Sequence, residues 1–162
     1  MTLKKDYIAA LVMVIGIVAI DQISKIGVDR YMNVGGRSLR LIPNFLYFTL
    51  HYNDGAAWGV LPGAMLFFVI VTVVALLLFI FLAKDLNFRH RMILSFGLVL
   101  LIAGATGNFI DRLRLGYVID FIDFYIFGYD FPIFNVADMA LTIGMIFFGF
   151  DVLFLEQKRK VK

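Results

Sequence analysis

Two aspartates, Asp120 and Asp138, are the residues of this sequence best suited to do chemistry. Both lie among apolar residues, in the segments Val118–Phe121 and Phe134–Asp138. An ionised carboxylate in apolar surroundings is costly unless it is paired or solvated, so such residues indicate a functional site. Two carboxylates that meet share one proton, and one can then act as a base on water while the other polarises a carbonyl. The pair predicts hydrolysis, although spacing alone does not bring the two residues together.

The composition is that of a membrane protein. Of the 162 residues 62% are hydrophobic, and the mean hydropathy is +0.91, whereas soluble domains are about 45–50% apolar. The chain has no cysteine, which excludes disulfides, thiolate catalysis and Cys-type metal sites. No nucleic-acid-binding motif is evident, and membrane topology explains the basic residues. We therefore expect a single membrane domain, residues 1–162, with no nucleic-acid partner.

Four apolar stretches are long enough to cross a bilayer as helices, which takes about 20 residues. They cover about residues 7–28, 60–83, 92–111 and 133–155. The first is expected to be a retained helix, because charged residues follow its apolar run and no small-residue cleavage site is evident. The predicted fold class is a mainly α membrane protein with four transmembrane helices.

Two other segments, about residues 30–59 and 112–132, are too polar to span. The first contains two runs of alternating apolar and polar residues, Leu39–Ile42 and Phe45–Tyr52, and this alternation predicts strands. Because an open sheet cannot face lipid inside the bilayer core, we expect a small sheet at the membrane surface. The second segment is expected to be a surface loop with interfacial aromatic residues.

The distribution of Lys and Arg predicts the orientation. Nine of these residues lie on the side of the termini and the 84–91 turn, and five lie on the other side. The positive-inside rule therefore puts both termini in the cytoplasm and both surface segments outside. The nine are Lys4, Lys5, Lys84, Arg89, Arg91, Lys158, Arg159, Lys160 and Lys162; the five are Arg30, Arg37, Arg40, Arg112 and Arg114.

With this orientation, ionisable residues from three helices lie at one depth, near the outer leaflet. Asp21 and Lys25 are four residues apart in the outer half of the first helix and can pair. The outer end of the third helix carries Asn108, Asp111 and Arg112, and Asp138 follows within two turns of the start of the fourth. The second helix contributes none, so the predicted site lies between the other three.

Several of these residues also have simple structural explanations. Asp21 and Lys25 are explained equally well as an ion pair that only stabilises the fold. Charges at a helix end, near the lipid headgroups, account for Asp111 and Arg112. At this point a catalytic and a structural role remain open for all four residues.

Other polar residues are expected to lie outside the site. Asp123 and Asp130 are predicted to be solvated loop residues, and Asp54, in an Asn-Asp-Gly sequence, is typical of a turn. His51 and His90 fall on opposite sides of the membrane, so they cannot form one metal site. We expect no metal at the site.

Five short motifs, in order along the chain, resemble those of lipoprotein signal peptidase (signal peptidase II), a family of bacterial membrane aspartic proteases. The resemblance covers almost the whole chain, and Ala103 stands where the family commonly has Gly. The motifs are Asp21–Lys25 (DQISK), Asn53–Trp58 (NDGAAW), Ala103–Arg112 (AGATGNFIDR), Val118–Phe121 (VIDF) and Phe134–Asp138 (FNVAD).

The resemblance implies an intramembrane aspartic endopeptidase with Asp120 and Asp138 as its catalytic pair. Its substrates would be prolipoproteins, cut just before a lipobox Cys that already carries a diacylglyceryl group. It implies a bacterial cell membrane location, membrane lipids as partners, inhibition by globomycin-type peptides, and no cofactor. The surface sheet would cradle the substrate, and a loop near residues 55–60 or 120–132 could close over it. Substrate-binding or supporting residues would be Asn53, Gly55, Asn108, Arg112, Asn135, Asp21, Lys25 and Asp111.

Three other functions remain open from the residues alone. A transporter also carries ionisable residues in its spans, but its polar path usually crosses both leaflets. A non-catalytic membrane assembly factor would need no carboxylate pair. A metal site built on two carboxylates is a third possibility, which a chelator would test.

Overall fold

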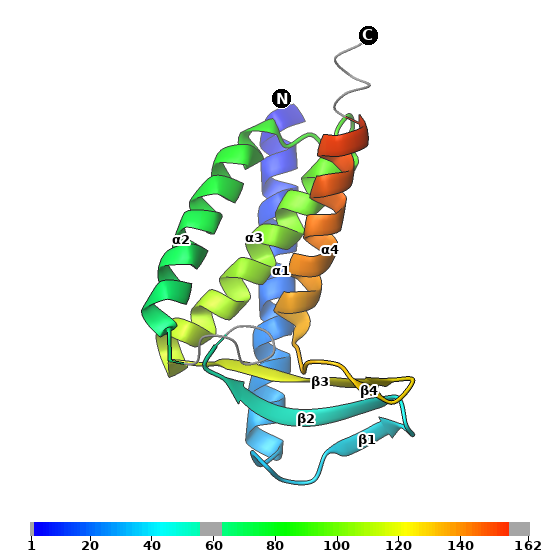
Figure 1. Ribbon diagram of the computed structural model, residues 1–162. Helices are drawn as coiled ribbons and strands as arrows, with labels where there is room; N and C mark the ends of the chain where they lie inside the picture. The colour runs from blue at the N-terminus through cyan, green and yellow to red at the C-terminus, as the bar shows by residue number, and fades with distance from the viewer. Residues whose placement is uncertain (1, 56–62, 156–162) are drawn as a thin grey trace.

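The computed structural model describes residues 2–55 and 63–155, and its helices form a bundle with both termini at one end (Figure 1). Four helices of the described residues are long and apolar enough to cross a membrane. This confirms the predicted class, a mainly helical membrane protein. The helices are α1 (Thr2–Tyr31), α2 (Met65–Leu82), α3 (Met92–Leu115) and α4 (Val136–Phe150), with a short 3-10 turn η2 (Ala83–Asp85) after α2 and a π-helical turn η3 (Asp151–Leu155) after α4.

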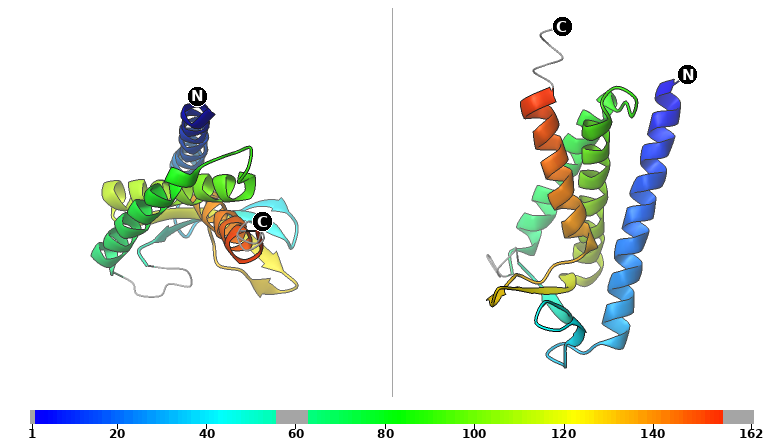
Figure 2. Two further views of the ribbon diagram at one scale, coloured as in Figure 1. Left: turned by 90° about the horizontal axis from the view of Figure 1, so that it is seen from above. Right: turned by 90° about the vertical axis from the view of Figure 1, so that its right-hand side faces the viewer.

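Helix α3 is the central element and packs against the other three helices (Figure 2). Its buried face includes Leu98, Val99 and Leu101, none more than 2% exposed. Helix α2, in contrast, has no buried residue and presents side chains such as Leu66 and Leu77 outward. Apolar side chains on the outside are expected where the surrounding solvent is lipid.

Small residues let α3 and α4 approach closely. A Cβ atom added to Gly104 would lie 2.9 Å from the Leu141 backbone nitrogen and would collide with the Ala137 carbonyl oxygen. A Cβ atom added to Gly144, on the facing helix, would likewise lie 2.9 Å from the Leu101 backbone nitrogen. The backbones of α3 and α4 therefore meet directly, and this contact positions the start of α4.

We predict that Gly104→Ala destabilises the protein by about 1–3 kcal/mol, because the new methyl group meets backbone that cannot move aside cheaply. Gly16→Ala is the matched control: its Cβ would meet nothing within 4 Å. Alanine favours a helix over glycine by about 1 kcal/mol, so this control should be neutral or stabilising. Thermal unfolding in detergent micelles measures both, and equal stabilities would contradict the close packing.

A four-stranded antiparallel sheet lies across the end of the bundle opposite the termini (Figure 1). Its order is β1-β2-β3-β4. Strand β2 is tied to α1 by the Tyr52 hydroxyl, which donates to Asp29 at 2.5 Å. The two strands predicted from alternation are confirmed. The strands are β1 (Leu39–Ile42), β2 (Leu46–Asn53), β3 (Val118–Ile126) and β4 (Tyr129–Asp130).

The segment 112–132, predicted as a loop, is instead mostly regular structure. Helix α3 continues to Leu115 and ends at Gly116, whose φ of 81° suits glycine. Strand β3 follows and pairs with β2, with His51 opposite Asp120. The prediction was wrong because residues 118–121 are buried on both faces of the strand, so the period-two alternation is missing.

Candidate functional site

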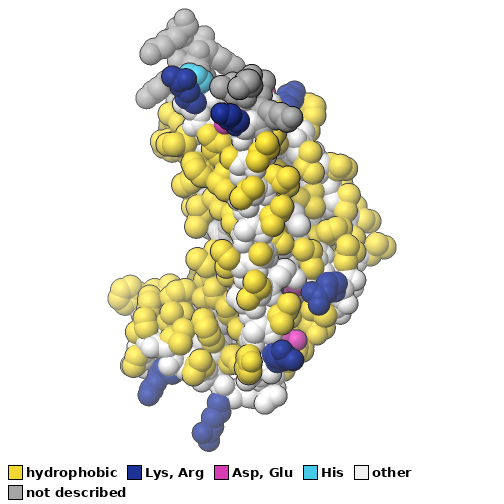
Figure 3. Space-filling model, turned by 180° about the vertical axis from the view of Figure 1, so that it is seen from behind, with side chains coloured by type: hydrophobic (Ala, Val, Ile, Leu, Met, Phe, Trp, Pro, Cys, Tyr) yellow, Lys and Arg dark blue, Asp and Glu magenta, His cyan; other side chains and the backbone are white. Residues whose placement is uncertain are grey.

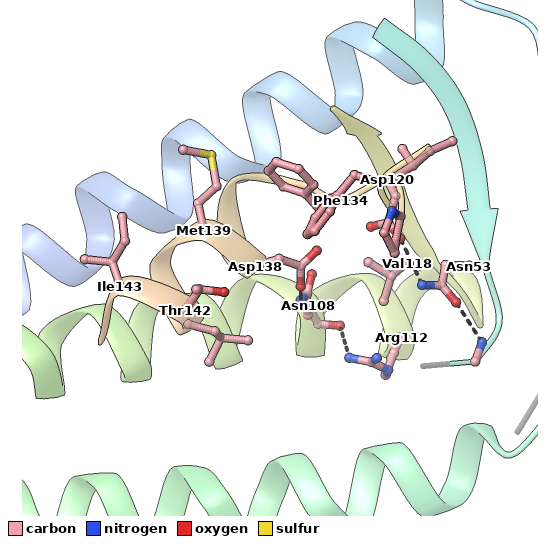
Figure 4. A pocket seen from close by; sticks show the side chains of 15 residues that line it. Asn53, Asn108, Arg112, Val118, Asp120, Phe134, Asp138, Met139, Thr142 and Ile143 are labelled. Carbon is pink, nitrogen blue, oxygen red and sulfur yellow. Dashed lines mark hydrogen bonds between the residues drawn. The ribbon is translucent and has the colours of Figure 1, made fainter. Parts of the chain in front are cut away.

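A cavity of about 610 Å³ opens where the sheet meets α3 and α4 (Figure 4). Asp120 and Asp138 both line it, so the fold brings together the two carboxylates that the sequence places 18 positions apart. Most of the other lining residues are apolar. They are Val118, Phe131, Pro132, Ile133, Phe134, Met139, Leu141 and Ile143, and the polar ones are Asn53, Asn108, Arg112 and Thr142, with Gly55.

Asp120 is held in place by two amide side chains. It lies on β3, is 2% exposed, and accepts hydrogen bonds from the side-chain nitrogens of Asn53 at 2.9 Å and Asn135 at 2.7 Å. Asn53 ends the neighbouring strand β2, and its Oδ1 accepts from the Gly55 backbone N–H at 3.0 Å. Both carboxylate oxygens of Asp120 therefore have a fixed donor.

Asp138 is positioned by the start of α4. Asn135 is the N-cap: its Oδ1 accepts from the Asp138 backbone N–H at 2.9 Å, and Asp138 Oδ2 accepts from the Asn135 backbone N–H at 3.1 Å. This reciprocal pair is a capping box. The other oxygen of Asp138 accepts from Asn108 Nδ2 at 2.7 Å. The carboxylate thus completes a helix end and faces the cavity at the same time.

Two asparagines connect the carboxylates. Asn135 Nδ2 donates to Asp120, and it also lies 3.1 Å from Asn108 Oδ1. Asn108 Nδ2 in turn donates to Asp138. The chain of bonds Asp120–Asn135–Asn108–Asp138 fixes the orientation of both amides, so that each offers its NH₂ group to a carboxylate.

A buried ion cluster supports this chain from the side of α1. Lys25 Nζ lies 2.9 Å from Asp21, 2.8 Å from Asp111 and 2.9 Å from Asn108 Oδ1, and it is 1% exposed. Asp21 also accepts from the Ala137 backbone N–H at 2.9 Å, next to Asp138. The cluster therefore connects α1, α3 and the first turn of α4.

The environment of Asp120 favours its neutral form. Its pKa is raised to about 7, first by burial of the carboxyl group and then by the negative charge of Asp138. Hydrogen bonds from Asn53 and Asn135 and the charge of Lys25 act in the opposite direction. Because hydrogen bonds to an ionised carboxylate lower its pKa, the two asparagines limit the rise that burial alone would cause.

Arg112 is the remaining charged residue of the cavity. Its guanidinium lies 5.4 Å from the centre of the Phe68 ring on α2 and 3.4 Å from the Asn108 carbonyl oxygen. A cation over an aromatic face is a favourable contact. Arg112 therefore bridges from α3 towards α2 along one wall of the cavity (Figure 4).

Two expectations for single aspartates were wrong. The simple explanation of Asp111 as a charge near the headgroups was wrong: Asp111 is 1% exposed and bound to Lys25, because α3 continues for another turn beyond it. Asp123, predicted to be solvated, is 4% exposed and accepts from Thr49 Oγ1 at 2.5 Å, because it lies on strand β3. Asp130 is exposed, as predicted.

The structure also identifies residues that the sequence did not single out for the site. Gln22 Nε2 lies 2.9 Å from Asp111 and 3.1 Å from Asp21 and so extends the ion cluster. Thr142 lines the cavity one helical turn after Asp138. That spacing of four residues, which puts both on one face of a helix, was a signal that could have identified Thr142.

Other predicted features lie elsewhere or outside the described residues. His51 on β2 and His90 in the turn before α3 are at opposite ends of the molecule, as expected. Within residues 2–55 and 63–155, no three His, Asp or Glu side chains gather closely enough to hold a metal ion. The end of the Asn53–Trp58 motif, and most of the loop expected to close near residues 55–60, fall outside the described part of the chain.

Comparisons with known proteins identify the family of the chain. A profile of the family described as "Signal peptidase (SPase) II" matches residues 13–154. The lipoprotein signal peptidase of Staphylococcus haemolyticus is 51% identical over 146 residues, 89% of this chain and 90% of that protein. That of Staphylococcus carnosus is 46% identical over 98% of this chain and 100% of its own length.

Two solved structures share the fold. Both are bacterial membrane enzymes determined by the in meso method, one at 2.3 Å and one at 1.9 Å resolution. The first superposes with a TM-score of 0.82 at 42% identity, covering 95% of this chain and 92% of that one; the second gives 0.80 at 44% identity, covering 90% and 93%. With the family profile and close relatives over nearly its whole length, the chain belongs to the signal peptidase II family.

Proposed function

We propose that this protein is an intramembrane aspartic endopeptidase that removes the signal peptide from diacylglyceryl-modified prolipoproteins, cutting just before the lipidated Cys. The observation that carries the proposal is the placement of Asp120 and Asp138 on one cavity, connected through Asn135 and Asn108. Relatives at 46–51% identity are named lipoprotein signal peptidases, which supports the same substrate class.

In this mechanism the two carboxylates share one proton. One carboxylate takes a proton from a water molecule, and the water oxygen attacks the scissile carbonyl carbon. The other carboxyl group, which is protonated, donates to the carbonyl oxygen. A proton then passes to the leaving nitrogen as the C–N bond breaks, giving a signal peptide with a free carboxylate and a lipoprotein with a free amino group. Asn53, Asn108 and Asn135 hold the carboxylates in place throughout.

The cavity fits a substrate that is anchored in lipid. Its mainly apolar lining beside α4 suits a peptide and acyl chains, while its polar end carries the carboxylates. We place the termini in the cytoplasm and this cavity near the outer leaflet, as the distribution of Lys and Arg favours. A lipid anchor holds the scissile bond at that depth and so reduces the entropic cost of positioning, which can be worth several kcal/mol.

A pair of synthetic lipobox peptides, one with a diacylglyceryl-Cys and one unmodified, tests the proposal with the purified protein in detergent. We expect cleavage of the lipidated peptide only, with mass spectrometry locating the cut before the Cys. Cleavage at another bond, or equal cleavage of both peptides, would overturn the proposed specificity. Loss of activity with a chelator would favour a metal site built on the two carboxylates instead.

The raised pKa of Asp120 predicts an alkaline limit to activity. Below about pH 7 the carboxyl group keeps the shared proton, and above it the proton is lost and both carboxylates are ionised. We therefore expect kcat/KM to fall as the pH rises through about 7. A rate that stays constant well above this value would contradict the assignment.

Asn53 offers a finer test of the same pKa. Its hydrogen bond stabilises the ionised form of Asp120, so Asn53→Ala should raise the pKa of Asp120. The alkaline limb of the pH profile of kcat/KM should then move to higher pH. The matched control is Asn87→Ala, in the turn before α3 and far from the cavity, whose side chain accepts from the Arg89 and His90 backbone N–H groups. A limb that does not move in Asn53→Ala would show that this bond does not affect the titrating group.

A further inference from the structure

The hairpin between β3 and β4 has an unusual turn. Residues Ile126 and Tyr129 pair, which leaves a two-residue loop of Phe127 and Gly128 with φ angles of 51° and 83°. Two positive φ angles are characteristic of a type I′ turn, where Asn, Asp or Gly is preferred at the first position. A bulky aromatic side chain in this backbone region is disfavoured. The turn would form more easily with Asn, Asp or Gly in place of Phe127.

No contact with the described residues offsets the unfavourable backbone conformation of Phe127. Its side chain is 106% exposed, so it packs against none of the described residues. Its neighbours on the hairpin are also apolar and exposed: Ile126 is 40% exposed, Tyr129 57% and Phe131 39%. The tip of this hairpin, residues 126–131, is therefore an apolar projection: Phe131 at its base packs edge-to-face on Phe134, whereas Phe127 at its end contacts none of the described residues.

The position of the tip indicates what covers it. The sheet extends sideways past the helices as a lobe with a largely apolar surface, and the molecule is hollowed between this lobe and the bundle (Figure 3). Basic side chains project from the edge of the lobe farthest from the helices. Arg37 and Arg40, both exposed, lie in and just before β1. The surface of the lobe is therefore apolar on the side that faces the helices and basic on the side that faces away from them.

A lipid leaflet matches this arrangement better than a folded partner. The apolar lobe continues the outward apolar surface of the membrane-spanning helices, so bilayer that surrounds the bundle also reaches the hollow. Aromatic side chains concentrate at the boundary between headgroups and acyl chains, and basic side chains attract lipid phosphates. We propose that the 126–131 hairpin tip inserts Phe127 into this boundary and anchors the sheet on the bilayer.

The anchor acts on the strand that carries a candidate catalytic residue. Strand β3 runs from Val118, beside the cavity, to Ile126 at the tip, and Asp120 lies near its cavity end. Fixing the tip at the membrane surface fixes the tilt of this strand relative to a substrate held in the same leaflet. The inference does not depend on the cleavage reaction, since it concerns the contact with lipid alone.

A spin label tests the depth of the tip, because the chain has no cysteine of its own. Phe127→Cys is labelled with a nitroxide in vesicles of phosphatidylethanolamine and phosphatidylglycerol. Leu77→Cys, exposed on α2, is the lipid control, and Arg89→Cys, exposed in the α2–α3 turn, is the water control. We expect the label at 127 to collide with oxygen several-fold more, and with a water-soluble nickel chelate several-fold less, than the label at 89.

Two results of this labelling experiment would overturn the proposal. One is a label at position 127 that collides with the nickel chelate as readily as the label at Arg89. The other is a label shielded from both reagents with spin–spin broadening, which would show a second copy of the chain on the tip.

The variant Phe127→Asn separates anchoring from folding. Asn-Gly is a preferred type I′ turn, so the hairpin should form at least as well, while the apolar anchor is removed. With the label moved to Ile126→Cys, nickel accessibility should rise several-fold in the Phe127→Asn background and stay low with Phe127→Trp. Equal accessibility in all three backgrounds would show that Phe127 does not hold the tip in lipid.

Discussion

Asp120→Asn and Asp138→Asn are each expected to lower the cleavage rate by about 10²–10⁴-fold, the usual contribution of a positioned acid or base. Asparagine keeps the shape and one acceptor oxygen of each side chain, but it cannot take a proton from water or carry the shared one. Because the two groups act as one unit, the double variant should be hardly worse than either single variant.

The structure gives a reason to expect that Asp138→Asn folds, and it offers a matched control for both variants. In Asp138→Asn the side-chain oxygen can still accept from the Asn135 backbone N–H and keep the capping box. Asp123→Asn is the matched control, because Asp123 lies on the same strand as Asp120 but outside the cavity lining. If either Asp120→Asn or Asp138→Asn folds and retains a near-normal rate, that residue is wrongly assigned. If the control loses activity while folded, the effect is not specific to the pair.

Lys25→Met is expected to destabilise the protein by about 3–5 kcal/mol, the usual cost of removing one partner from a buried ion pair. Methionine fills much of the space, but Asp21 and Asp111 would remain buried without their cation. Asn108 would also lose one of the two donors to its Oδ1 and keep only Asn135 Nδ2, so the NH₂ group that faces Asp138 would be held less firmly. The measurement is unfolding in mixed detergent micelles.

Two further variants distinguish charge from packing. Lys84→Met makes the same chemical change at an exposed position beside Phe81, and surface changes are usually within about 0.5 kcal/mol. Adding Asp21→Asn and Asp111→Asn to Lys25→Met removes the unpaired charges and should recover part of the loss. A Lys25→Met protein as stable as Lys84→Met would show that the cluster does not hold the helices together.

The helices and part of the sheet were predictable because their patterns are local. Hydropathy alone indicates the four spans, and alternation indicates β1 and β2. Strand β3 could not be recognised in this way, since the consecutive residues Val118 and Ile119, whose side chains point to opposite faces of the strand, are both buried. The surroundings of a strand covered on both faces are set by tertiary packing, which its own sequence does not reveal.

The site depends even more on contacts between distant segments. Asn135 and Asp138 have the spacing of a capping box, so their contact was open to prediction. The link from Asp120 through Asn135 to Asn108 requires β3, α3 and α4 to be correctly packed, and only the family resemblance pointed to it. The ion cluster around Lys25 likewise depends on α3 continuing past Asp111. The catalytic roles of Asp120 and Asp138 themselves stay predictions.

The mechanism depends most directly on the coupling between Asp120 and Asp138 through one proton. Infrared difference spectra of protein with ¹³C-labelled aspartate, recorded across neutral pH, report that proton as a carboxylic-acid band. We expect a band that disappears as the pH rises through about 7 in the wild type and is missing in Asp120→Asn. In Asp138→Asn the same band should titrate at lower pH, since the charge that raises the pKa of Asp120 is gone. An unchanged midpoint in Asp138→Asn, or a band that survives in Asp120→Asn, would contradict the shared proton.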